Sequence, residues 1–124
     1  MKVLVIDDSR AMRAILSKIM SELGFDVVTA ADGREGLDRL CEDDGVGLVL
    51  VDWNLPGMNG YEFVKAVRRD PSWDEVRLIM VTTETERENV SRAMDAGADE
   101  YVMKPFTEDV LLEKLVFLGL VKES

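Results

Sequence analysis

Short apolar runs alternate with longer amphipathic stretches along this chain of 124 residues. The apolar runs are rich in branched side chains, and three are continuous enough to be strands buried on both faces. We predict five strands, over residues 2–6, 26–30, 48–51, 76–81 and 101–103. Strands that alternate with helices in this way favour a parallel sheet joined by right-handed crossovers. The pattern therefore predicts a doubly wound α/β domain with helices on both faces of the sheet.

The helices between these strands are predicted from apolar stripes and capping residues. The stripe of the first helix consists of Met12, Ile15, Leu16, Ile19 and Leu23. Gly24 then stands at the position of a C-terminal cap. Three later helix starts are indicated by a capping side chain three residues before a glutamate: Asp32 with Glu35, Asn59 with Glu62, and Thr83 with Glu86. We expect the fifth helix to begin at Thr107 and to bury Leu111, Leu112, Leu115 and Val116.

Composition narrows the range of possible functions. With 47% apolar residues, the chain suits one domain with its own core, over residues 1–124. Its net charge of -10 opposes binding to nucleic acid or to an anionic membrane, so we expect neither as a partner. A single cysteine and the absence of histidine exclude an internal disulfide and the usual zinc sites. Because neither a signal peptide nor a membrane-spanning run is evident, we expect a cytoplasmic protein.

Charged and hydroxyl side chains stand where the predicted strands end. Asp7 and Asp8 follow the first strand, Asp52 the third and Lys104 the fifth, while Thr82 lies at the end of the fourth. In doubly wound sheets, sites form beyond the carboxyl ends of the strands. Three carboxylates and one ammonium group leave an excess of negative charge, so the carboxylates would repel one another unless a cation joined them. Oxygen ligands without histidine or thiolate favour Mg²⁺.

Asp52 is the candidate nucleophile of this predicted cluster. A carboxylate beside a metal ion, a lysine and a hydroxyl group can attack phosphorus and form an aspartyl phosphate. Mg²⁺ and Lys104 would neutralise charge on the phosphoryl oxygens, and Thr82 could donate a hydrogen bond to one of them. The donor must be another molecule, because the chain contains neither an ATP-binding Gly-x-x-x-x-Gly-Lys loop nor a histidine.

Four motifs resemble the receiver domain of two-component response regulators, most closely the chemotaxis type. They are VIDDSRAMR, VLVDWNLPGMNGYEF, IMVTTETERENV and GADEYVMKPF. The resemblance covers nearly the whole chain, with the paired acids, the lone aspartate, the hydroxyl residue and Lys-Pro in the family's order. It implies a flavodoxin-like fold with five helices and the strand order 2-1-3-4-5, which the hydrophobic pattern alone leaves open.

The resemblance also assigns roles to the residues at the strand ends. It implies that Asp52 accepts the phosphoryl group, and that Asp8, Asp52 and the backbone carbonyl of Asn54 bind Mg²⁺, with Asp7 acting largely through water. Lys104 would pair with the phosphoryl group, and its bond to the following proline is expected to be cis. The fold and the chemistry therefore lead to the same group of residues.

Four residues, two of them new, are assigned to switching and to loss of the phosphoryl group. In the family, Thr82 moves toward the phosphoryl group and Tyr101 turns inward, which reshapes the face made by helix four, strand five and helix five. Asn54 and Glu84 flank the path of the water that removes the phosphoryl group. The chain departs from the chemotaxis pattern at Ser9, Arg10, Thr83 and Glu86. We therefore expect the output surface to suit a different partner.

The leading functional hypothesis is a stand-alone phosphorylation switch rather than an enzyme with turnover on other substrates. Its expected partners are a sensor histidine kinase of the CheA type, an output target such as a flagellar motor switch protein, and a phosphatase; a phosphate-sink role is also open. One alternative is a Mg²⁺-dependent phosphatase of the haloacid dehalogenase type, although that class places its nucleophile after the first strand. Another is a pseudo-receiver, although such domains usually lose the acid pair or the lysine.

The remaining expectations concern residues outside the cluster. We expect Trp53 to lie in an exposed loop and Cys41 to pack on the apolar stripe of the second helix. The methionines expected in the core are Met12, Met20, Met80, Met94 and Met103.

Overall fold

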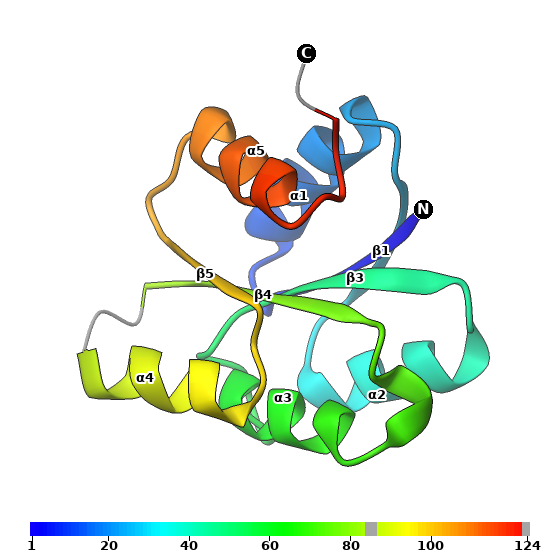
Figure 1. Cartoon of the computed structure of the whole chain (residues 1–124), viewed down its shortest axis with the longest axis vertical. Coiled ribbons are helices and arrows are strands. Elements are labelled where there is room, and N and C mark those ends of the chain that lie inside the picture. Colours follow the sequence, from blue (N-terminus) through cyan, green and yellow to red (C-terminus); the bar gives the residue numbers. More distant parts are fainter. Residues whose placement is uncertain (84–86, 123–124) are drawn as a thin grey trace.

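Five parallel strands form one sheet between two layers of helices (Figure 1). The computed structural model describes residues 1–83 and 87–122. The strands are β1 (Lys2–Ile6), β2 (Asp26–Ala30), β3 (Val46–Val51), β4 (Arg77–Thr82) and β5 (Glu100–Met103). Their order across the sheet is β2-β1-β3-β4-β5, and every pair of neighbours is parallel. The doubly wound fold and its implied strand order are therefore confirmed.

The helices divide two against three between the faces of the sheet. In Figure 1, α1 (Arg10–Glu22) and α5 (Glu108–Phe117) cover one face, and α2 (Gly33–Glu42), α3 (Gly60–Arg68) and α4 (Arg87–Ala96) cover the other. A short 3₁₀ helix, η1 (Pro71–Trp73), precedes β4 and was not predicted. None of the helices within the described ranges has the length and apolar character needed to cross a membrane.

Alternating side chains of the central strands divide the core into two clusters. On the side of α2, α3 and α4, Leu4 and Ile6 of β1 join a cluster that includes Phe63. On the side of α1 and α5, Val3 and Val5 join the other cluster. Because successive residues of a strand point to opposite faces, one fully apolar run supplies both clusters. The continuous apolar strands were recognisable for this reason.

The third strand begins two residues earlier than predicted. The predicted strand starts at Leu48, yet the observed strand includes Val46 and Gly47. The register between β1 and β3 shifts at this point, since Lys2 pairs with Val46 while the next residue pairs with Leu48. This irregularity places one extra residue in β3, as in a β-bulge. Local pattern did not reveal it.

The predicted caps and stripes were largely correct. Asp32 accepts a hydrogen bond from the Glu35 amide, and Asn59 with Glu62 forms a reciprocal capping box. The proposed cap at Thr83 pairs with Glu86, which lies outside the described residues. In α1, however, Ile15 is 49% exposed, and Met20 lies buried beside Leu16. The apolar stripe predicted for α1 is therefore wrong at Ile15, which faces solvent.

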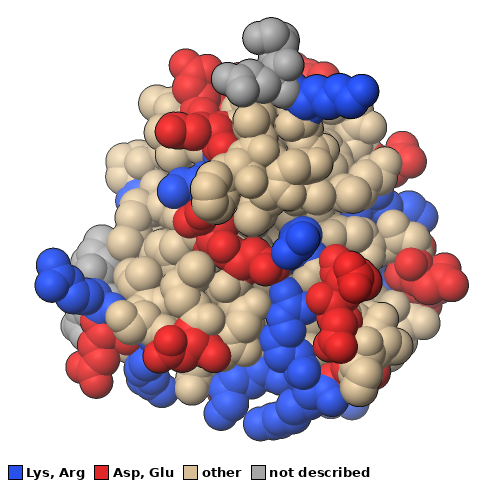
Figure 2. All heavy atoms as spheres, in the orientation of Figure 1, with Lys and Arg blue, Asp and Glu red and all other residues tan. Residues whose placement is uncertain are grey.

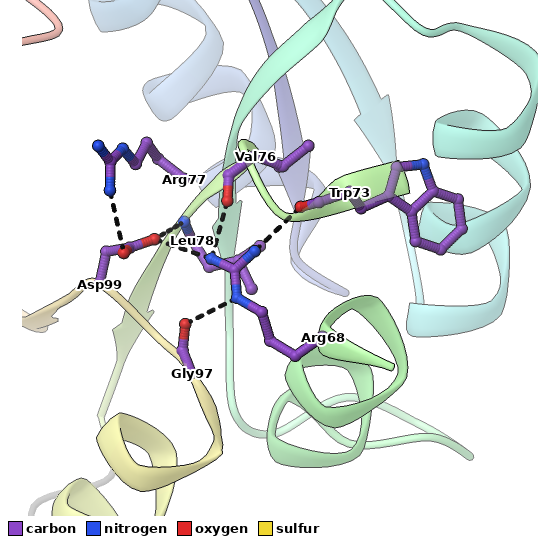
Figure 3. Close-up of polar contacts among 7 residues, drawn as sticks. All are labelled: Arg68, Trp73, Val76, Arg77, Leu78, Gly97 and Asp99. Atoms are coloured by element: carbon purple, nitrogen blue, oxygen red, sulfur yellow. Dashed lines mark hydrogen bonds and ion pairs between the residues drawn. The ribbon is translucent and has the colours of Figure 1, made fainter. Parts of the chain in front are cut away.

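Arg68 ties together the segments at the end of the sheet where β4 begins. Its guanidinium donates to the carbonyls of Gly97, Trp73 and Val76 and to the carboxylate of Asp99, at 2.8–3.0 Å (Figure 3). The side chain thereby joins the end of α3, η1, the approach to β4 and the turn before β5. Gly97 is required here, because its φ is 121° and a Cβ would lie 2.5 Å from the Arg68 side chain.

The surface carries charges of both signs despite the strongly acidic composition. On the face drawn in Figure 2, Lys and Arg side chains gather along the lower edge, over the layer of α2, α3 and α4, and acidic groups are scattered above them. Among the basic residues of α3 are Lys65 and Arg68, and those of α4 include Arg92.

Candidate functional site

Three aspartates converge where β1 and β3 end. Asp7 directly follows β1 and Asp52 directly follows β3, and these strands are neighbours in the sheet. One carboxylate oxygen from each of Asp7, Asp8 and Asp52 lies within 4.8 Å of the other two. Asp7 is 1% exposed and Asp52 7% exposed, whereas Asp8 faces solvent. Sequence reasoning placed these residues at one edge of the sheet, and the structure brings them together.

Lys104 supplies a positive charge to the two buried carboxylates. Its Nζ donates to Asp7 Oδ2 at 2.7 Å and to Asp52 Oδ2 at 3.2 Å. Burial by itself lowers the pKa of Lys104, but the hydrogen bond to Asp7 and the charges of Asp52 and Asp7 outweigh it, so the pKa lies above its ordinary value. The Lys104–Pro105 bond is cis, as the resemblance implied.

Asp7 is held in place by contacts that sequence reasoning did not identify. The Ser9 amide donates to Asp7 Oδ1 at 2.9 Å, and Arg13 donates to the Asp7 carbonyl at 2.7 Å. Ser9 also caps α1 by accepting a hydrogen bond from the Met12 amide. The Ser9 cap could have been recognised from residue type, whereas the contact of Arg13 depends on where the first turn of α1 directs its side chain.

Asp52 is enclosed by the loop that leads into α3. The Asn54 amide donates to Asp52 Oδ1 at 3.3 Å, and the Asn54 side chain is exposed. The Gly60 amide donates to the Trp53 carbonyl at 2.8 Å. A Cβ at Gly60 would lie 2.2 Å from the Asp52 carbonyl oxygen, so only glycine allows this close approach. Gly60 is a supporting residue that the sequence analysis missed.

The residues predicted to switch lie on the neighbouring strands. Thr82 is the last residue of β4 and is fully buried, and its carbonyl accepts from the Lys104 amide at 2.9 Å. Tyr101 of β5 is half-buried against the core cluster on the side of α4. Glu84 lies outside the described residues. Thr82 is therefore next to Lys104 in the fold, and Tyr101 stands one strand further along.

Three expectations about neighbouring residues were wrong. Trp53 is 8% exposed and does not lie in an exposed loop, because its ring stacks on Tyr61. Cys41 is exposed, since α2 buries Leu40 instead. Met94 and Met103 are each 38% exposed and lie outside the core.

The donor set fits a small, hard cation. Oxygens bound to one Mg²⁺ at about 2.1 Å lie about 3–4 Å apart, which small rotations of these carboxylates would achieve from their present separation. Two of the three side chains are buried, so their charges are poorly screened by water. Within the described part of the chain, no other group of acidic, histidine or cysteine side chains has this spacing.

The sequence and the fold are both similar to those of known proteins. The family model of the response regulator receiver domain matches residues 3–116. The chain belongs to this family. A CheY homolog of Campylobacter jejuni is 45% identical to this receiver over 116 residues, which are 93% of this chain and 89% of the relative. Chemotaxis protein CheY1 of Helicobacter pylori is 45% identical over 121 residues, 96% of this chain and 98% of the relative.

Solved structures agree with this assignment. The receiver superposes on chemotaxis protein CheY4 of Vibrio cholerae with a TM-score of 0.87 at 38% identity, covering 94% of this chain and 96% of that chain. A CheY-like receiver domain from Methanospirillum hungatei gives a TM-score of 0.83 at 35% identity, covering 96% of this chain and 92% of that chain. Sequence and structure thus both place the chain in the receiver-domain family.

Proposed function

We propose that residues 1–124 form one receiver domain in which Asp52 takes a phosphoryl group from a phosphohistidine of a sensor histidine kinase. The observation that carries this proposal is the contact of Lys104 Nζ with both Asp52 and Asp7, beside a third carboxylate. An oxygen of Asp52 attacks phosphorus, the phosphorus–nitrogen bond of the donor breaks, and the donor imidazole leaves with the electron pair. The products are an aspartyl phosphate and a neutral histidine on the kinase.

The surrounding residues stabilise the charge that develops on the phosphoryl oxygens. Lys104 pairs with one of them, and the Thr82 hydroxyl donates to another. Asp7, Asp8, Asp52 and the Asn54 carbonyl would hold Mg²⁺, which when bound neutralises the carboxylates and the incoming phosphoryl oxygens. Water later attacks phosphorus and regenerates the carboxylate, and we assign the tuning of this step to Asn54 and, by family resemblance, to Glu84. The domain therefore accepts and loses its own phosphoryl group but acts on no other substrate.

Phosphorylation signals by changing how the domain binds its partners. Phosphorylation draws Thr82 toward the phosphoryl group, and Tyr101 turns inward into the space behind it. These movements reshape the face made by α4, β5 and α5. Because the similar proteins are chemotaxis regulators, we propose a chemotaxis role in the cytoplasm. The donor would be a CheA-type kinase and the target a flagellar motor switch protein, with a phosphatase shortening the signal.

Intact-mass measurement with acetyl phosphate and Mg²⁺ tests the proposal. The native chain should gain one phosphoryl group that survives acid and is lost in base, whereas Asp52→Asn should gain none. Asp74→Asn, which removes an exposed carboxylate far along the chain, is the matched control and should still be modified.

Two outcomes would contradict the proposal. A native chain that gains no adduct would behave as a pseudo-receiver. A chain that releases phosphate steadily from many organic monoesters would be a phosphatase, and Asp52→Asn would then stop turnover rather than a single modification.

A further inference from the structure

An aromatic pair connects the residue after Asp52 to α3. The indole of Trp53 stacks on the ring of Tyr61, with centroids 5.5 Å apart and planes inclined by 23°. The backbone reinforces the stack, because the Gly60 amide donates to the Trp53 carbonyl at 2.8 Å. Offset stacking of this kind contributes beyond burial alone. The position of Trp53, and with it the backbone of Asp52, is therefore fixed against the first turn of α3.

Two cations lie over the same Tyr61 ring. The Arg92 guanidinium, from α4, lies 4.6 Å from the ring centroid, and Lys65 Nζ lies 5.1 Å from it. Lys65 belongs to α3, as does Tyr61, so its contact stays within one helix. Arg92 belongs to α4 and therefore bridges two helices. The two cations can therefore be compared directly. Both contact the same ring, but only Arg92 connects α3 with α4.

We propose that Tyr61 and Arg92 are positioning residues that couple α4 to the loop carrying Asp52. The connection runs from Arg92 to the Tyr61 ring, from that ring to Trp53, and from Trp53 to Asp52 through one peptide plane. The Gly60 amide holds the Trp53 carbonyl and the Tyr61 ring holds the indole, so displacement of the Asp52 backbone acts on both contacts of Trp53. The part of this inference that concerns phosphorylation rests on the function proposed above.

Coupling of this kind acts in both directions. Whatever stabilises one position of the acceptor loop also stabilises the matching position of α4, and a partner bound to α4 changes the phosphorylation equilibrium by the same factor. The link uses residues other than Thr82 and Tyr101, because it runs through Tyr61 of α3. It gives the domain a second route between Asp52 and α4.

Hydrogen exchange of the whole chain, without phosphodonor, tests the link directly. Arg92→Gln should speed exchange of the Leu55 and Gly60 amides about two- to five-fold, the factor that corresponds to an exposed cation–π contact. Lys65→Gln should leave these amides unchanged although residue 65 is closer to them in sequence. Arg92→Lys should restore most of the native protection. Equal effects of Arg92→Gln and Lys65→Gln, or no effect of Arg92→Gln, would overturn the link.

A double variant separates the link from general loosening. Tyr61→Leu should speed exchange of the same amides, and adding Arg92→Gln to it should have little further effect, because both changes break one connection. Additive effects would mean that Arg92 acts elsewhere and would overturn the proposal.

Acetyl phosphate and Mg²⁺ then test the phosphorylation half of the proposal. Modification of the native chain should change the exchange of amides in α4, and Arg92→Gln should reduce that change at least two-fold at equal adduct. An unreduced change would overturn the coupling. A native chain without adduct would instead contradict the proposed function, while the exchange experiment without phosphodonor would still decide whether the link exists.

Discussion

At the scale of single residues, the acceptor loop depends on a glycine that carries no chemistry. Gly60 begins α3 against the Asp52 carbonyl oxygen, and no side chain fits between them. In an ordinary helix, alanine in place of glycine stabilises by about 0.5–1 kcal/mol. Here that gain is smaller than the cost of moving the backbone of the loop.

Gly60→Ala should therefore lower the free energy of unfolding by about 1–3 kcal/mol, measured in urea at neutral pH. It should also slow modification of Asp52 by acetyl phosphate, because the displaced backbone carries that carboxylate. Gly45→Ala is the control, since a Cβ there would meet only one terminal oxygen of the half-buried Asp43 side chain, at 3.1 Å. A Gly60→Ala protein as stable as the control would contradict this account of the close approach.

Lys2 and Asp43 form an ion pair at the opposite end of the sheet from the aspartate cluster. The hydrogen bond from Lys2 holds the pKa of Asp43 below its ordinary value, and the hydrogen bond to Asp43 holds the pKa of Lys2 above its own. The pair therefore stabilises the fold across neutral pH. Its contribution is lost as pH falls through the lowered Asp43 value or rises through the raised Lys2 value.

Comparison of the native chain with Asp43→Asn across pH tests this interaction. The native chain should be the more stable at pH 7, and the difference should shrink as the solution is acidified below about pH 4, where the aspartate of the unfolded chain becomes protonated while Asp43 of the folded chain, with its lowered pKa, still resists protonation. Urea unfolding at each pH provides the measurement. A difference that stays constant, or grows in acid, would show that the pair does not stabilise the fold.

At the scale of secondary structure, a single side chain, that of Arg68, links several segments where β4 begins. Arg68 satisfies three carbonyls and shares Asp99 with Arg77 and the Leu78 amide. Its side chain is 19% exposed, so the ion pair is partly shielded from water.

Arg68→Lys should destabilise the protein by about 2–3 kcal/mol. A lysine keeps the charge but cannot serve four acceptors with a planar group, and partly buried acceptors would remain unsatisfied. Arg69→Lys, in the next position and exposed, should change stability little. Equal stability of the two variants in urea would show that only the charge of residue 68 matters. The hydrogen bonds of the planar guanidinium would then contribute nothing to stability.

At the scale of the whole molecule, repulsion within the acidic site adds to the repulsion that comes from the net charge of -10. Folding gathers Asp7, Asp8 and Asp52 into a small volume, and the unfolded chain separates them. A cation that binds the folded cluster and not the unfolded chain must therefore stabilise the fold. Lys104 offsets part of the repulsion in the absence of such a cation.

Mg²⁺ should accordingly raise the thermal midpoint relative to NaCl of equal ionic strength. At a free concentration 100 times the dissociation constant, the gain would be about 2.7 kcal/mol, which corresponds to several degrees. Differential scanning calorimetry with and without chelator measures the shift, and Asp8→Asn should reduce it. A shift that NaCl reproduces would indicate general screening in place of a specific site.

Much of this protein was determined by local sequence. Continuous apolar strands, stripes and caps such as Asn59 with Glu62 predict the alternation of strands and helices, because they depend on neighbours within a few residues. Asp7, Asp52 and Lys104 were recognisable at strand ends for the same reason. The strand order came from family resemblance, since hydrophobic patterns do not encode which strands pair.

Other features were decided by tertiary structure alone. The burial of Trp53, the approach of Gly60 to Asp52, the fork of Arg68 and the bridge from Arg92 to Tyr61 all join residues from different segments. Such contacts depend on the angle and depth at which helices pack on the sheet, which no local pattern records. Sequence by itself thus determined the elements and the chemistry at their ends. Packing determined which side chains hold that chemistry in position.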